Sequence, residues 1–234
     1  WSRGLGDVYK RQHEFQMSGA NGPAYTSIVG GGANGCILHY IENKDMLKNG
    51  DLVLIDAGCE YEDYASDITR TFPVNGKFSD EQAAIYDIVL KALKEAIDVT
   101  QAGTPYNKTN ETTIRVITEG LVELGLLKGD INDLIKAEAH REFYMHGAGH
   151  WLGLDVHDVG DYKIDGEWRI YEPGMVVTIE PGIYISPKNK KVDTKWRGIG
   201  VRIEDDIVIT KTGNINLTSK VPKERNEIEK MMAK

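Results

Sequence analysis

Acidic side chains interrupt the most apolar segments of this chain. Asp56 follows the run LVLI, Glu180 follows VVTI, and Glu204 follows VRI. The unbroken apolar run LVLI is typical of a strand that is buried on both faces, and the other two segments also have the character of buried strands. A buried carboxylate without a partner is strongly unfavourable, and it takes up a proton if nothing compensates its charge. Something positive must therefore face these acids in the folded chain.

Two further residues in strand-like segments belong to the same group. Asp67 lies within YEDYASDITRTF, and His150 lies within MHGAGHWLGLDVHD. Few basic residues stand near these segments, chiefly Arg70, Arg197 and Arg202, so ion pairing offsets only part of the negative charge. Each acid alone could be a strand-end residue solvated at a turn. The set of four acids and one imidazole favours a shared metal site instead.

The charge balance of this set predicts two metal ions. Four carboxylates carry a charge of −4, which two divalent cations would neutralise, and a bridging hydroxide would leave about −1. Oxygen ligands with one imidazole and no thiolate suit manganese, cobalt or iron, and zinc is a further candidate. We therefore expect two divalent cations as cofactors, with Mn²⁺ first among them.

The remaining pattern predicts an α+β domain. Ser79 and Gln82 form a capping box, after which apolar residues recur at helical spacing to residue 101. A second helix is expected after the turn at Gly103, ending near Leu124. Strands are predicted over residues 26–30, 36–40, 51–58, 61–72, 145–158, 175–185 and 200–210. Strands on both sides of two helices, bearing one shared set of acids, indicate a single α+β domain.

Composition limits the partners and the location. The net charge of −8 speaks against nucleic acid and acidic membranes as partners. No apolar run approaches the roughly 20 residues of a membrane helix, and residues 1–30 lack a secretory core, so we expect a cytoplasmic protein. Cys36 and Cys59 are too few for a disulfide framework and are interpreted as packing residues.

The front of the chain differs from the rest. Residues 1–12 show neither helical nor strand periodicity, contain no initiator Met, and run into a segment that already has the character of a domain interior. We therefore expect one catalytic domain over residues 13–234 that is truncated at its front.

Five segments occur in an order that resembles a known family: IDAG, SDITRTF, HGAGHWLGLDVHD, TIEPGIY and RGIGVRIEDDIVIT, with SDITRTF beginning eleven residues after IDAG. Together they resemble the signature series of the creatinase and aminopeptidase P family, over about residues 13–230. The resemblance implies the pita-bread fold. It also implies an N-terminal domain in full-length members, absent here, and a homo-oligomer for the full-length protein.

The resemblance assigns the metal ligands to Asp56, Asp67, His150, Glu180 and Glu204. Asp67 and Glu204 would bridge both ions, Asp56 would chelate one, and His150 with Glu180 would hold the other. The implied activity is hydrolysis of the bond between an N-terminal residue and a following proline, by a hydroxide that bridges the two ions. Glu180 would also shuttle a proton.

Further residues resemble the substrate-binding and catalytic set of the family. His157 and His39 would donate hydrogen bonds to the substrate carbonyl or the developing oxyanion, and His146 would line the proline pocket. Arg202 stands two residues before the last ligand, so on one strand both side chains would face the site. Tyr184 is a candidate pocket wall. A lone histidine or tyrosine of this kind could equally be a core or rim residue.

Three other interpretations compete with an Xaa-Pro aminopeptidase. Methionine aminopeptidases share the fold but lack a strand that reads RIEDD, which counts against them. Prolidases share the five ligands and the Arg–Glu strand and act on Xaa-Pro dipeptides, so they remain the main alternative. A pita-bread domain that has lost its ligands can serve as a peptide-binding scaffold, but none of the five is lost here. We therefore expect peptides with proline in second position as substrates.

Overall fold

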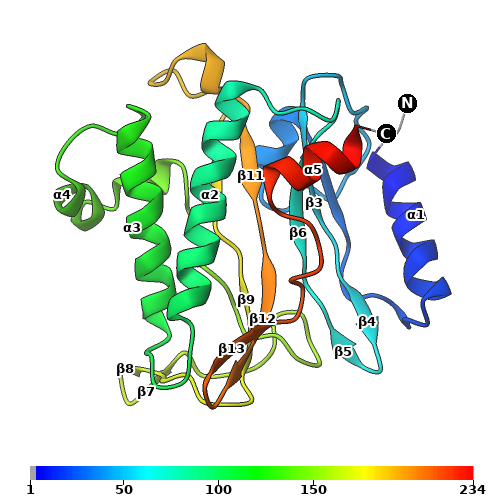
Figure 1. Ribbon diagram of the computed structural model, residues 1–234, viewed down its shortest axis with the longest axis vertical. Helices are drawn as coiled ribbons and strands as arrows, with labels where there is room; N and C mark the ends of the chain where they lie inside the picture. Colours follow the sequence, from blue (N-terminus) through cyan, green and yellow to red (C-terminus); the bar gives the residue numbers. More distant parts are fainter. Residues whose placement is uncertain (1–3, 234) are drawn as a thin grey trace.

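Two three-stranded antiparallel sheets form the two halves of the molecule (Figure 1). The structure is a computed structural model that describes residues 4–233. The first sheet has the order β2-β3-β6, with β2 at Ile28–Gly31, β3 at Leu52–Asp56 and β6 at Thr69–Pro73. The second has the order β13-β12-β9, with β9 at Val176–Ile179, β12 at Asp205–Thr210 and β13 at Gly213–Asn216. In both halves the antiparallel ladder satisfies the backbone hydrogen bonds of apolar segments that leave water.

A short antiparallel pair joins the halves. It consists of β10 at Gly182–Tyr184 and β11 at Gly200–Arg202. The backbone N–H of Arg202 donates to Thr71 Oγ1 over 3.2 Å, and Thr71 Oγ1 donates to the Arg202 carbonyl over 3.0 Å. Because Thr71 belongs to β6, these bonds place β11 against the first sheet.

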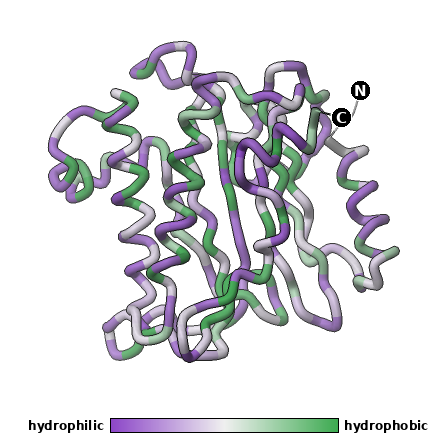
Figure 2. Tube along the Cα trace, viewed as in Figure 1, coloured by the Kyte–Doolittle hydropathy of each residue, from purple (hydrophilic) through white to green (hydrophobic). Residues whose placement is uncertain are grey.

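Helices cover the two sheets unequally. α2 (Asp80–Val99) and α3 (Asn107–Glu123) pack side by side over the second half, whereas α1 (Gly4–Met17) lies along the first half (Figure 1). The shorter segments are α4 (Ile131–Lys136), α5 (Arg225–Met232), η1 (Gly32–Cys36), η2 (Ala139–Glu142), η3 (Thr194–Trp196), β1 (Gly22–Pro23), β4 (Cys59–Tyr61), β5 (Tyr64–Ala65), β7 (Lys163–Ile164) and β8 (Glu167–Trp168). Apolar residues gather on the strands and on the sides of α2 and α3 that face them, while α1 is largely hydrophilic (Figure 2).

The α+β class is confirmed, and so are its main elements. The capping box forms as predicted, with Ser79 Oγ accepting from the backbone of Gln82 and the Gln82 side chain accepting from the backbone of Ser79. The second predicted helix is α3, and Gly125 behind it takes the left-handed conformation, with φ of 72°. The apolar run before Asp56 is β3, and each of its five residues is buried.

Five predicted strands are wrong in part, and two of them, 175–185 and 200–210, are each broken into two shorter strands. Residues 36–40 form the end of η1 and a turn. Cys36, Leu38 and Tyr40 nevertheless pack inward, so every second side chain is buried as in a strand, although the segment pairs with no other strand. Residues 61–72 are split, because Glu62 and Asp63 take positive φ values of 49° and 67° and form the turn of the β4–β5 hairpin before β6 begins.

A further wrong prediction concerns residues 145–158, which form no regular strand. Their single bridge is Trp151↔Val177, and Ala148, His150 and Leu152 also form backbone hydrogen bonds with Glu180, Thr178 and Val176. Glycines interrupt this stretch, and a Cβ at Gly149 would collide with the carbonyl oxygen of Thr178. The backbone at Gly149 therefore approaches that of Thr178 too closely for any larger residue.

The start of the chain contains an element that the sequence did not predict. Residues 4–12 belong to α1, and residues 1–3 lie outside the described residues. α1 packs against β1 and β2. Among the described residues, no helix combines the length and the apolar character that crossing a membrane requires.

Candidate metal centre

The acids of the predicted site stand where strands end. Asp56 is the last residue of β3, and Asp67 lies two residues before β6, at the same end of that ladder. Glu180 directly follows β9 and Glu204 directly precedes β12, and these two strands pair with each other. The backbone N–H of Glu204 donates to the carbonyl of Thr69 over 3.1 Å. The ends of the two ladders therefore meet, and this junction brings the four acids together.

This arrangement corrects two strand assignments. Glu180 and Tyr184 do not share one strand, because Pro181 lies in the break between β9 and β10. Arg202 and Glu204 do not share one either, since β11 ends at Arg202 and β12 begins at Asp205. The chain crosses from one sheet to the other at both acids.

One cavity of about 220 Å³ collects nearly all of the predicted site residues. Its walls include the predicted ligands and most of the predicted substrate-binding residues: Asp56, Asp67, His150, Glu180, Glu204, His39, His146, His157 and Arg202. Tyr184 stands directly behind this lining, where its hydroxyl contacts His146 Nε2 at 2.8 Å. The histidines His13 and His140, which we left out of the site, do not line the cavity.

Three of the five predicted ligands form a compact group. Asp67, His150 and Glu204 each offer one ligand atom, and these atoms all lie within 4.8 Å of one another. The carboxylate of Glu180 adds an oxygen 3.7 Å from His150 Nε2. Asp56 is outside this group of three, and its Oδ2 accepts from Arg202 Nη2 over 2.6 Å.

The hydrogen bond of His150 leaves its Nε2 atom available to bind a metal ion. Its Nδ1 lies 2.9 Å from the carbonyl oxygen of Trp151, which can only accept, so Nδ1 carries the hydrogen. In the neutral ring Nε2 then presents a lone pair, and this atom lies 3.4 Å from Asp67 Oδ2 and 3.7 Å from Glu180 Oε1. A lone pair facing two carboxylate oxygens is repulsive unless a proton or a cation stands between them. A backbone-anchored imidazole of this kind is the usual support for a metal-bound histidine.

The surroundings of the carboxyl groups disfavour their ionised form and raise their pKa values. Burial raises the pKa of Glu180 to about 7 even though Arg202 and His150 act to lower it. Burial, followed by repulsion from Asp67 and Glu180, raises the pKa of Glu204 well above its ordinary value. Burial also raises the pKa of Asp56, against the attraction of Arg202. One guanidinium does not compensate this cluster, whereas divalent cations would, so the donor set fits such ions.

The histidines of the cavity differ in pKa and in exposure to solvent. Burial, followed by repulsion from Arg202, lowers the pKa of His146 to about 4, so this ring is neutral near pH 7. Burial, followed by repulsion from His150, lowers the pKa of His157, whose ring centroid lies 4.3 Å from that of His150. His39 and His157 are exposed at the rim. Both rim histidines can therefore reach a molecule that enters the cavity.

Two side chains that the sequence analysis missed bind the predicted ligands directly. The hydroxyl of Tyr25 lies 2.5 Å from both Asp56 Oδ1 and Asp67 Oδ1. The hydroxyl of Thr69 donates to Glu204 Oε2 over 2.6 Å and accepts from Arg202 Nε over 3.2 Å. Thr69 could have been found, because it stands two residues after Asp67 in an apolar segment. The sequence did not indicate a role for Tyr25, since this residue lies in a glycine-rich loop without a recognisable pattern.

Comparisons with known proteins agree with this site. The sequence profile of metallopeptidase family M24 matches residues 6–211. The Xaa-Pro aminopeptidase of Escherichia coli (strain K12) is 58% identical over 220 residues, which cover 94% of this chain and 49% of that protein. Human Xaa-Pro aminopeptidase 3 is 40% identical over 222 residues, covering 95% of this chain and 43% of that protein.

Solved structures show the same fold. Aminopeptidase PepP of Pseudomonas aeruginosa superimposes with a TM-score of 0.95 at 60% identity, covering 96% of this chain and 51% of that chain. A glutamate-to-alanine variant of Escherichia coli aminopeptidase P, in complex with substrate, gives a TM-score of 0.96 at 55% identity and covers 99% of this chain and 52% of that chain. The chain thus spans about half the length of the relatives that it matches. It has the pita-bread fold, and it belongs to metallopeptidase family M24.

Proposed function

We propose that this chain is the catalytic half of a dinuclear-metal aminopeptidase, which hydrolyses the bond between an N-terminal residue and a following proline. The observation that carries the proposal is the junction of the two ladders, where four carboxyl groups and the lone pair of His150 converge on one cavity. The names of the relatives supply the substrate class.

Two divalent cations would be held by the five clustered side chains. Asp67 and Glu204 would bridge both ions, Asp56 would complete one site, and His150 with Glu180 would complete the other. Mn²⁺ is our first choice, followed by Co²⁺, Fe²⁺ and Zn²⁺. Ions of this kind, when bound, lower the pKa of water toward neutrality and polarise a carbonyl oxygen.

The residues of the chain itself supply proton transfer and orientation. Glu180 lines the cavity, where its carboxylate would also shuttle a proton. His157 and His39 stand at the rim, where an imidazole N–H can donate to the carbonyl oxygen of a bound peptide as negative charge develops on it.

His146 suits the wall of the proline pocket better than it suits proton donation. Its Nδ1 donates to the carbonyl of Gly147 over 2.8 Å, so in the neutral ring Nε2 accepts from the hydroxyl of Tyr184. Arg202 Nη1 donates in turn to the oxygen of Tyr184 over 3.1 Å. This chain of hydrogen bonds uses both ring nitrogens and fixes the orientation of all three side chains.

A cytoplasmic location and a homo-oligomeric full-length protein complete the proposal. The free cysteines Cys36 and Cys59 fit a reducing compartment. The domain boundary at residue 13 and the preceding domain of the full-length protein remain predictions from the resemblance.

Metal content tests the site independently of turnover. After loading and mild dialysis, elemental analysis should find close to two equivalents of a divalent metal per chain. Asp67→Asn and Glu204→Gln should each remove both ions, whereas Glu172→Gln, at an exposed carboxylate outside the cavity, should remove none. Two equivalents retained in Asp67→Asn would contradict the bridging role.

Peptide length separates the proposed activity from that of a prolidase. The metal-loaded protein should release the first residue from Xaa-Pro peptides of four or five residues. Hydrolysis of the Xaa-Pro dipeptide alone would favour a prolidase. His157→Ala should lower kcat by about 10²–10³ with both ions retained, and His146→Ala should erode the preference for proline. His13→Ala, on the exposed face of α1, is the control for both variants.

A further inference from the structure

A second cleft lies on the other side of a segment that walls the metal cavity. It has a volume of about 440 Å³ and is formed by the start of α3, the segment Gly147–Gly149 and the β7–β8 region. Gly147 and Gly149 line both this cleft and the metal cavity. The cleft therefore adjoins the cavity in which the peptide would bind.

Three aromatic side chains supply the apolar walls of the cleft: Tyr106, Tyr162 and Trp168. The rings of Tyr106 and Tyr162 meet edge to face, with their centroids 4.8 Å apart. The hydroxyl of Tyr106 donates to the carbonyl of Gly149 over 2.7 Å, which fixes its ring to the shared wall. The ammonium of Lys163 lies 4.4 Å from the centroid of Trp168, so one face of that ring already accommodates a cation.

Glu111 is the only charged residue among the lining residues that the structure describes. Asn107 Nδ2 donates to Glu111 Oε1 over 2.5 Å, which holds this carboxylate in place at the cleft. Neither a lysine nor an arginine is among these lining residues. A carboxylate beside aromatic rings favours a ligand that brings a cation with N–H donors.

We propose that this cleft is a subsite for a basic side chain of the peptide substrate, lysine or arginine. The aromatic walls would contact the methylene stem and the cation, and the carboxylate of Glu111 would accept from its N–H groups. The identification of the ligand as part of a substrate rests on the proposed peptidase function. The cation preference itself rests only on the cleft.

Binding to the metal-free protein tests the subsite without turnover. The probes are Nα-acetyl-lysine amide and Nα-acetyl-norleucine amide, which differ in the ammonium but share the stem. Chemical-shift titration should give an affinity for the lysine probe about three- to ten-fold higher. Glu111→Gln and Tyr162→Leu should each reduce that ratio toward one. Equal affinities in the unchanged protein would overturn the proposal.

Matched controls separate the cleft from general electrostatic attraction. Glu123→Gln removes an acid from the same helix outside the cleft, and Tyr64→Leu removes an exposed aromatic ring on β5. Neither should change the ratio of the two affinities. A fall in the ratio with Glu123→Gln as large as with Glu111→Gln would assign the preference to net charge and overturn the subsite.

Turnover by the metal-loaded protein then tests the link to substrate. Xaa-Pro peptides carrying lysine or norleucine at the first, third or fourth position should differ in kcat/KM at one of these positions, with the lysine peptide about three- to ten-fold better. Glu111→Gln should remove that advantage. Cleavage of neutral peptides with no lysine advantage at any position would overturn the subsite but leave the peptidase function standing. Binding of the lysine probe with no peptide cleaved would refute the peptidase function instead.

Discussion

The two sheets both position predicted ligands at the metal centre, but they are packed in different ways. β13-β12-β9 is covered by α2 and α3, and its core includes fully buried residues such as Ile85, Leu93 and Ile117. β2-β3-β6 has a much smaller cluster on its outer face, centred on Val53 and Ile55 with Val8 of α1. The second half can hold its ligands through its own core, whereas the first half depends more on its contacts with the second.

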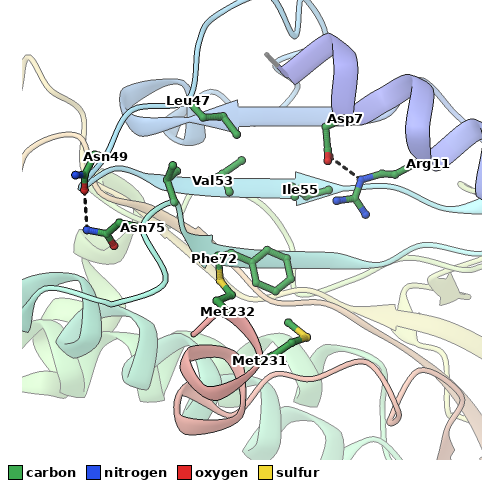
Figure 3. A pocket seen from close by; sticks show the side chains of 11 residues that line it. Asp7, Arg11, Leu47, Asn49, Val53, Ile55, Phe72, Asn75, Met231 and Met232 are labelled. Atoms are coloured by element: carbon green, nitrogen blue, oxygen red, sulfur yellow. Dashed lines mark hydrogen bonds and ion pairs between the residues drawn. The ribbon is translucent and has the colours of Figure 1, made fainter. Parts of the chain in front are cut away.

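The outer face of the first sheet also contains an apolar cavity (Figure 3). It has a volume of about 640 Å³ and lies between α1 and α5, over Val53, Ile55 and Phe72. The only ion pair drawn there is Arg11 with Asp7, over 2.8 Å, and no predicted site residue lines it. This cavity therefore lies on the opposite face of β3 from the metal centre.

The two halves are connected by buried polar contacts around the metal centre. Arg70 of β6 donates to the carbonyl of Glu204 over 2.5 Å and to Asp205 Oδ1 over 2.7 Å. Arg202 of β11 pairs with Asp56 of β3. If these contacts and the metal ions hold the first half in place, disturbing them should affect it more than the second half.

Metal removal is expected to have the largest effect. Each ion present at a thousand times its dissociation constant stabilises the folded state by about 4 kcal/mol, because the ions bind only the assembled site. Chelation should therefore lower the melting temperature substantially. Amide hydrogen exchange should accelerate in β3 and β6 more than in β9 and β12. An unchanged melting curve after verified metal removal would contradict the clustering of the acids.

Loss of Arg70 should have the next largest effect. Arg70→Met keeps the apolar stem but removes the guanidinium from Asp205, which is fully buried. Because Lys223 still pairs with Asp205 in this variant, we expect a loss of about 1.5–3 kcal/mol in the free energy of unfolding, measured by urea denaturation.

An exposed arginine serves as the control for that experiment. Arg115 pairs with Glu95 and Glu119 on the surface of α2 and α3, so Arg115→Met should cost less than about 1 kcal/mol. Equal losses in the two variants would show that the connection between the halves contributes little.

A third prediction concerns pH in the metal-free protein. Burial raises the pKa of Glu180 to about 7 and that of Asp206 to about 7, whereas both groups titrate at ordinary, lower values in the unfolded chain. Between those values the folded state binds more protons at these two carboxyl groups, which lowers its stability as the pH rises. The lowered pKa of His146, about 4, offsets part of this loss below about pH 6.5, so the net fall from pH 5 to 8 should be roughly 1–3 kcal/mol.

The metal-loaded protein should show the opposite trend, because protons compete with the ions for the same carboxylates. The pKa of Asp205 is lowered, since Arg70 and Lys223 outweigh its burial, and its contribution is lost only at more acidic pH. Parallel melting curves from pH 5 to 8, with and without metal, measure the difference. A metal-free protein that becomes more stable as the pH rises would contradict the raised pKa values.

The parts of the molecule that the sequence predicted are those with a local cause. The apolar run of β3 and the capping box of α2 each follow from a few neighbouring residues, and both are present. The prediction of a strand at 145–158 was wrong because glycines in this segment allow close contact with neighbouring backbone, which only the folded structure shows. Tyr25 could not be found, since only the folded chain brings its hydroxyl to Asp56.

The smallest predicted effect tests whether the second half is self-sufficient. Ser79 caps α2 by accepting from the backbone of Gln82, and Ser79→Ala removes that bond. The variant should lose about 1 kcal/mol of unfolding free energy, a typical value for a cap. Because the cap lies outside the metal cavity, the metal affinity of the folded protein should stay unchanged. Thr69→Val provides the contrast, since it removes the hydroxyl that donates to Glu204 and should weaken metal binding as well as stability. If Ser79→Ala lowered metal affinity as much as Thr69→Val, the second half would not hold its ligands through its own core, and the difference between the two halves would be one of degree only.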